Sequence, residues 1–196
     1  MRVTDQQPFR VAFVAGVSPD KWVRRWRERT PRDPIEVDLV EDSDQVAVLH
    51  ETRADMSFVR LPVERAGLHV IPLYVEVPVV VLSVEHELTL LDELSLADVA
   101  DEELIEDAPM TVKDAVAVVA GGGGALVVPM SLARLYARKD VTSRPLVDGP
   151  ESRVALAWRV DNEDPRVETF IGIVRGRTAQ SSRDQPPEPK RKRKRS

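Results

Sequence analysis

The sequence predicts an α/β fold. Strand-like apolar runs alternate with helical segments over residues 9–61, in the order β-α-β-α-β, and such short-spaced alternation favours a parallel sheet with right-handed crossovers. The chain has 196 residues, of which 42% are hydrophobic. This length suits one compact domain or one domain of two small lobes.

Apolar runs predict the strands of this unit. They are expected, in chain order, at residues 9–14, 35–39, 56–61, 68–73, 77–83, 125–128 and 154–158. Pro62 and Pro129 end two of them, because proline cannot donate to a strand ladder. Residues 74–76 are expected to connect one lobe to the other.

Capping residues mark where the helices begin. The expected caps are Ser18, Asp42 or Ser43, Ser95, Thr111 and Asp164. The first helix carries Trp22 and Trp26 on its apolar face, as part of the core or of a dimer face. Glycines 121–124 end the helix that begins at Thr111, and a further helix follows Pro129.

Catalytic and metal-binding motifs are missing from the sequence. The histidines, His50, His69 and His86, stand in no metal-ligand spacing. No cysteine is present, which excludes disulfides, thiolate sites and cysteine nucleophiles. The glycine run at 121–124 lacks the following Lys-Ser/Thr and the strand-to-helix order of a phosphate loop. We therefore expect a non-enzymatic protein with no metal and no cofactor.

Charge is distributed unevenly along the chain. Removing the last six basic residues from the 28 Lys and Arg leaves 22 against 33 Asp and Glu, a body charge of −11. Those six residues are Lys190, Arg191, Lys192, Arg193, Lys194 and Arg195. They could neutralise about six phosphates of a nucleic acid, without base readout because no aromatic residue interleaves them. A solubilising terminus and a contact with the acidic body are the alternatives.

No apolar run approaches the ~20 residues of a membrane helix, and the polar N-terminus shows no secretory signal. The expected location is therefore the cytoplasm.

Five segments together resemble the effector-binding domain of LysR-type transcription regulators. They are residues 53–62 (R-A-D-M-S-F-V-R-L-P), 85–102 (E-H-E-L followed by L-A-D-V-A-D-E), 119–129 (V-A-G-G-G-G-A-L-V-V-P), 154–159 (V-A-L-A-W-R) and 170–171 (F-I). Their order and their spread over most of the chain make the resemblance fairly specific. It implies a type 2 periplasmic-binding-protein-like fold, with two small α/β lobes, two hinge strands and a ligand cleft between the lobes.

The resemblance also implies a division of the chain. Residues 1–8 form an N-terminal extension, and residues 9–179 form the effector-binding-like domain. Lobe 1 covers about 9–74 and 150–179, lobe 2 covers about 78–148, and 180–196 form a disordered basic tail. Only about eight residues precede the first strand, so the family's helix-turn-helix is expected to be absent. Five residues between Ile105 and Thr111 replace a strand and a helix, so lobe 2 is expected to be shortened.

Helix starts and the resemblance together predict a site for a small anionic effector. The predicted ligand-binding residues are Ser18, Arg60, Pro62, Thr111, Gly122 and Gly124. Ser18 and Thr111 begin helices, whose free N–H groups favour anions, and Arg60 could pair with a carboxylate through two hydrogen bonds. Alternatively, the two hydroxyls only cap their own helices, and Arg60 is a surface arginine.

Two functional hypotheses follow from the resemblance and the predicted site. The first is ligand sensing or partner binding in transcriptional regulation, by a stand-alone domain that forms a homodimer. The second is a degenerate, ligand-free dimerisation scaffold, held near nucleic acid by its tail. An open polar cleft favours the sensor, and a filled cleft favours the scaffold.

Overall fold

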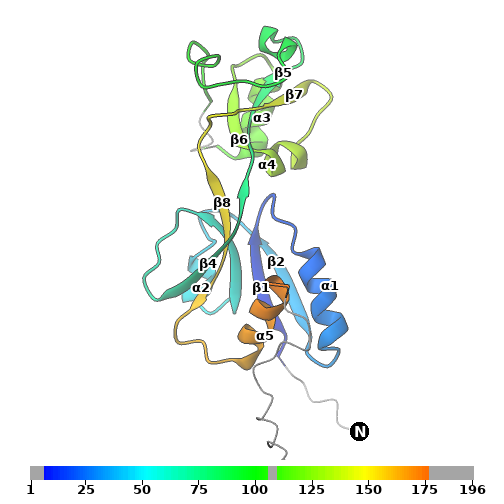
Figure 1. Cartoon of the computed structure of the whole chain (residues 1–196), viewed down its shortest axis with the longest axis vertical. Coiled ribbons are helices and arrows are strands. Elements are labelled where there is room, and N and C mark those ends of the chain that lie inside the picture. The colour runs from blue at the N-terminus through cyan, green and yellow to red at the C-terminus, as the bar shows by residue number, and fades with distance from the viewer. Residues whose placement is uncertain (1–6, 106–109, 177–196) are drawn as a thin grey trace, which may run out of the picture.

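The computed structural model describes residues 7–105 and 110–176. Two α/β lobes stand end to end and are joined by crossing strands (Figure 1). Lobe 1 is built on a five-stranded sheet in the order β2-β1-β3-β8-β4, and lobe 2 on a three-stranded sheet in the order β6-β5-β7. The predicted two-lobed α/β architecture with a small second lobe is therefore confirmed. The predicted tail, residues 180–196 with its six basic residues, lies outside the described residues.

Lobe 1 takes most of its elements from the first part of the chain. They are β1 (Phe9–Val14), α1 (Asp20–Arg29), β2 (Ile35–Val40), α2 (Ala47–His50), β3 (Met56–Leu61), β4 (Leu68–Glu76), β8 (Ser152–Arg159) and α5 (Pro165–Val174). Strand β1 pairs in parallel with β2 and β3, whereas β8 runs antiparallel to β3 and β4. The parallel strands thus end together at the edge of the sheet that faces lobe 2 (Figure 1).

Lobe 2 is formed by the middle of the chain. Its elements are β5 (Pro78–Ser83), the 3-10 helix η1 (Glu87–Leu90), α3 (Val112–Ala120), β6 (Leu126–Pro129), α4 (Met130–Leu135) and β7 (Val141–Pro145). Sequence reasoning missed β7, because V-T-S-R-P contains no apolar run. Its pairing with β5 makes it a strand.

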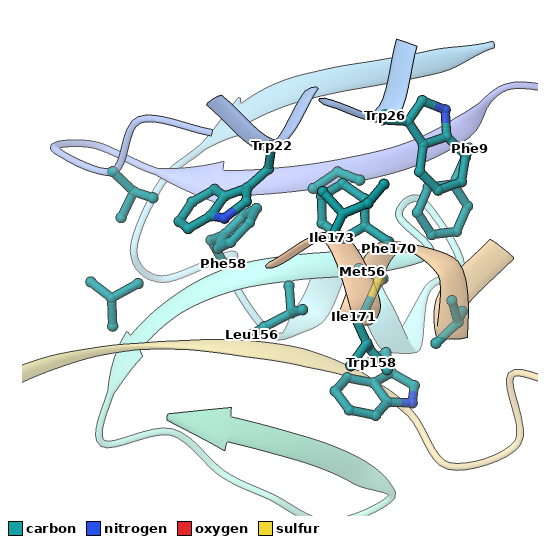
Figure 2. Close-up of a cluster of buried hydrophobic side chains, with 14 of the residues drawn as sticks. Phe9, Trp22, Trp26, Met56, Phe58, Leu156, Trp158, Phe170, Ile171 and Ile173 are labelled. Atoms are coloured by element: carbon teal, nitrogen blue, oxygen red, sulfur yellow. The ribbon is translucent and has the colours of Figure 1, made fainter. Parts of the chain in front are cut away.

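Aromatic side chains fill the core of lobe 1 (Figure 2). The ring of Trp26 stacks on Phe9 with centroids 5.0 Å apart, and the ring of Trp22 stacks on Phe58 at 4.7 Å. Phe170 of α5 lies tilted against Phe9 and Trp26. Both tryptophans are buried, so α1 turns its aromatic face to the core and not to a dimer partner.

Two of the predicted helix caps are confirmed. Thr111 Oγ1 accepts a hydrogen bond from Asp114 N, and Asp164 Oδ1 accepts one from Arg166 N. In both cases the side-chain oxygen satisfies a backbone donor of the first turn.

Three other predicted caps are wrong. Helix α1 begins one residue later than expected: the Pro19 carbonyl accepts from Trp22 and Val23 N, and Ser18 caps nothing. Helix α2 begins after Val46, without a side-chain cap from Asp42 or Ser43. Residues 95–98 form a hydrogen-bonded turn and not a helix. A capping sequence alone cannot propagate a helix when no apolar stripe follows it.

A buried hydroxyl generates the first prediction. Ser57, in β3, is fully buried, and its Oγ has no hydrogen-bond partner in the described part of the chain. An unsatisfied buried polar group destabilises a fold. Replacing Ser57→Ala should therefore leave the free energy of unfolding unchanged or raise it by about 1 kcal/mol, measured by chemical denaturation.

The matched control is Ala155→Ser, which adds a hydroxyl to the buried apolar cluster that contains Ala157, the strand-pairing partner of Ser57. It should lower the free energy of unfolding by about 1–3 kcal/mol. A Ser57→Ala variant that is clearly less stable than the wild type would show that the hydroxyl has a partner.

Candidate functional site

Polar side chains of both lobes meet where the lobes join. We call this group the interlobe cluster, and it consists of Asp42, Arg60, Glu76, Ser131 and Ser152. Asp42 follows β2, Arg60 lies near the end of β3, Glu76 ends β4 and Ser152 begins β8. Ser131 comes from α4 of lobe 2. The cluster thus lies at the carboxyl ends of parallel strands, where open α/β sheets bind ligands.

The Glu76 carboxylate is the centre of the cluster. Arg60 donates to it through Nε (2.8 Å to Oε2) and Nη2 (3.4 Å to Oε1). Ser131 Oγ donates to Oε1 at 2.6 Å, and Ser152 Oγ donates to Oε2 at 2.8 Å. The Glu76 side chain is only 4% exposed. Four donors therefore replace its water and occupy the acceptor positions of a carboxylate.

Arg60 is held from several sides. Nη1 donates to Asp42 Oδ2 and Nη2 to the Ala15 carbonyl, each at 2.9 Å. The Gln45 side-chain amide hydrogen-bonds to the backbone of Arg60, accepting from its N–H at 2.7 Å. The Arg60 side chain is 11% exposed. It is thus a largely buried residue at the junction of the lobes and not a surface arginine, and its anionic partners belong to the chain itself.

The Arg60–Glu76 pair is ionised at neutral pH. Burial raises the pKa of the Glu76 carboxyl, but hydrogen bonds from Arg60, Ser131 and Ser152 lower it, and the net shift is downwards. Burial lowers the pKa of the Arg60 guanidinium, and the carboxylates of Glu76 and Asp42 raise it, with a net upward shift. Favourable hydrogen bonds thus outweigh desolvation at both members of the pair.

The loop between β1 and α1 brings the backbone of lobe 1 onto α4. Gly16 has φ +82°, and a Cβ there would lie 2.7 Å from Ser131 Oγ. Only glycine combines this backbone conformation with so close an approach. The loop that offers the Ala15 carbonyl to Arg60 is therefore also a point of contact between the lobes.

Ser18 and Thr111 bind carboxylates in their own helices and form no hydrogen bond with the interlobe cluster in the described part of the chain. Ser18 is exposed, and its Oγ donates to Asp20 Oδ2 at 2.9 Å. Thr111 is exposed and hydrogen-bonds to Asp114. Each predicted anion position at a helix start therefore already has a carboxylate in the first turn, which interacts with the positive end of the helix.

The other predicted ligand positions have separate surroundings. Pro62 is exposed immediately after β3. Gly122 has φ +81° and open space where a Cβ would stand. Gly124 has φ +114°, and a Cβ there would overlap the Glu103 carbonyl, which accepts a hydrogen bond from Ala125 N at 2.9 Å. Gly124 thus permits two backbone segments to approach each other, which is a structural role.

Sequence reasoning named Arg60 as a ligand-binding residue, with a surface arginine as the alternative, and missed the partners that it has in the structure. Glu76 did leave a signal, since it is the only charged residue between positions 70 and 83. A lone carboxylate in an apolar strand is either exposed or paired. Ser131 and Ser152 left none, because serine is common at helix and strand ends.

An apolar hollow of about 440 Å³ lies beside the hinge, lined in part by Val75, Val77, Leu146 and Val147.

Within the described ranges there is no group of three or more His, Cys, Asp or Glu side chains placed to hold a metal ion. Nor does any helix there have the length and apolar character needed to cross a membrane.

Comparison with protein families matches residues 5–113 to the LysR substrate binding domain. The chain is also similar to the HTH-type transcriptional regulator AlsR of Bacillus subtilis (strain 168). The two are 25% identical over 179 residues, which covers 77% of this chain and 59% of AlsR. This chain thus spans about three fifths of the length of that curated relative.

Solved structures show the same fold. The BenM effector binding domain with its effector benzoate superposes with a TM-score of 0.72 and 21% identity, covering 92% of this chain and 96% of that one. A mutant of the OxyR regulatory domain from Pseudomonas aeruginosa has a TM-score of 0.68 and 21% identity, with coverage of 86% and 96%. Both lobes therefore have the architecture of these domains, a type 2 periplasmic-binding-protein-like fold.

The lowered pKa of Glu76 makes stability depend on pH. In the unfolded chain a glutamate has a pKa of about 4.3. The stabilisation from the lower folded pKa is thus fully present above that value and is lost as the pH falls through the folded pKa. Glu76→Gln should lower the free energy of unfolding by about 3 kcal/mol at pH 7. The difference from the wild type should narrow below about pH 4, in denaturation series across pH. A difference that stays constant from pH 7 to pH 3 would contradict this account.

The glycines at 122 and 124 should respond differently to a methyl group. Gly122→Ala should lower the free energy of unfolding by about 1–2 kcal/mol, because its only cost is a left-handed backbone conformation for a residue with a Cβ. Gly124→Ala adds an overlap with the Glu103 carbonyl, so its loss in unfolding free energy should exceed about 3 kcal/mol. Thermal and chemical denaturation of both variants measure this, and equal losses would show that the Glu103 segment can move away.

Proposed function

This chain belongs to the LysR substrate-binding-domain family, and on that premise we propose that it senses a small ligand between its two lobes. The family supplies the ligand-binding part of transcriptional regulators, which is a regulatory and not a catalytic role. We further propose a cytoplasmic location, because transcription takes place there.

The interlobe cluster is the observation that carries this proposal. It joins β3, the hinge strands and α4 through one buried ion pair and two serine hydrogen bonds. A ligand that interacts differently with these groups in two arrangements of the lobes would shift the population between them. A small anion fits this role, since Arg60 is the buried cation of the cluster.

A second candidate function is an interaction scaffold that needs no ligand. The specific observation in its favour is that Arg60 already binds Glu76, Asp42 and the Ala15 carbonyl. In this case the domain would act as a homodimer with a protein partner, and the basic tail at 190–195 would add non-specific contact with nucleic acid.

A thermal-shift screen of the full chain separates the two functions. The compounds are small carboxylates, amino acids and phosphorylated metabolites. A ligand at 100 times its Kd stabilises the folded state by about 2.7 kcal/mol, or about 5–10 °C in Tm for a domain of this size. The sensor predicts at least one such hit, and its affinity should fall about tenfold or more in Arg60→Lys, which loses the planar fork.

The matched control is Arg24→Lys, at an arginine whose side chain is 75% exposed on α1. This variant should bind the hit as the wild type does. The proposal of a ligand sensor whose site is the interlobe cluster would be overturned by a screen without hits. It would also be overturned by a hit whose affinity is the same for the wild type and Arg60→Lys. The first of these results favours the scaffold.

A further inference from the structure

We propose that Arg60, Ser131 and Ser152 form a carboxylate-binding site whose resident ligand is the chain's own Glu76 side chain. Four donor atoms converge on this one carboxylate, at 2.6–3.4 Å. They come from β3 and β8 of lobe 1 and α4 of lobe 2. A convergence of this kind, around a group that is 4% exposed, is the geometry with which proteins hold a bound carboxylate.

The donors are held in place by groups other than Glu76. Asp42, the Ala15 carbonyl and Gln45 bind Arg60. Ser131 lies in the first turn of α4, which is attached to the hinge by a hydrogen bond from Met130 N to the Val77 carbonyl at 2.8 Å. Removal of the Glu76 carboxylate should therefore leave a vacant site and not a collapsed one.

Ser152 is held in a similar way. Its backbone pairs with that of Glu76 in the antiparallel register of β4 and β8. This pairing depends on main-chain atoms and not on the glutamate side chain, so a variant at position 76 retains it.

The chemistry of the site identifies its ligand class. Glu76→Ala keeps Cβ and removes Cγ and the carboxylate, which together have the size and charge of an acetate ion. The vacated site should thus bind acetate well, formate less well because the methyl volume stays empty, and bulky carboxylates such as pivalate not at all.

In the wild type, Glu76 competes with every ligand for these donors. Its carboxylate is tethered beside them, so its effective concentration is high. An external carboxylate has to exchange with Glu76 at the junction of the lobes. The tethered group thus selects against simple carboxylates that lack further contacts.

Chemical rescue of the full chain tests the inference. Thermal unfolding is measured for the wild type and Glu76→Ala in 100 mM sodium acetate and in sodium chloride of equal ionic strength. Glu76→Ala should lower Tm by about 10 °C in chloride. Acetate should restore about 3–6 °C if its Kd is about 10 mM, and should change the wild-type Tm by less than about 1 °C.

The matched control is the double variant Arg60→Met, Glu76→Ala. It has the same void at position 76 but lacks the guanidinium, so acetate should not stabilise it. Adding Ser131→Ala to Glu76→Ala should weaken the acetate effect, because one donor is lost.

If Glu76→Ala does not fold in chloride, the yield of soluble protein on refolding in acetate against chloride is the second readout. The inference is overturned if acetate gives no advantage in either readout, or if the double variant gains as much as Glu76→Ala. This test requires no effector. If the ligand screen finds no hit but acetate rescues Glu76→Ala, the sensor is overturned and the carboxylate site is retained. If the screen finds a hit but acetate does not rescue the variant, the carboxylate site is overturned and the sensor is retained.

Discussion

The buried Glu76 carboxylate is the constraint on which the polar contact between the lobes depends, because Arg60 binds it within lobe 1 and Ser131 binds it from lobe 2. A carboxylate that is 4% exposed has lost most of its hydration, and it is stable there only with donors in place of water. Two of these donors belong to Arg60, and the others are hydroxyls from α4 and β8. Satisfying one buried charge therefore draws on elements of both lobes.

Hydrophobic packing contributes little to this junction. The buried apolar clusters are separate, with two in lobe 1 and two in lobe 2. Across the described residues, Ala15 is the one side chain of lobe 1 that packs against a cluster of lobe 2. The lobes are thus joined by strands, by the approach of Gly16 to Ser131 and by the polar cluster. A junction of this kind can change its arrangement without disrupting either core.

Local sequence patterns predicted a helix cap correctly where the capping residue stands directly before an amphipathic segment. Thr111 and Asp164 stand directly before amphipathic segments, and both cap their helices. Ser18 failed because Pro19 beside it provides the capping carbonyl, and Ser18 hydrogen-bonds instead to Asp20. Strand β7 was missed because its pairing with β5 holds it, without an apolar pattern of its own.

The sequence by itself determined the two-lobed α/β class, the aromatic face of α1 and the family, because periodicity and segment order can be recognised in local stretches of the chain. Only the tertiary structure decided what Arg60 binds. Glu76 lies 16 residues from Arg60, 55 from Ser131 and 76 from Ser152. No local pattern links such positions. They are brought together by the crossing of the hinge strands and the docking of α4, and a buried charge then requires all of them at once.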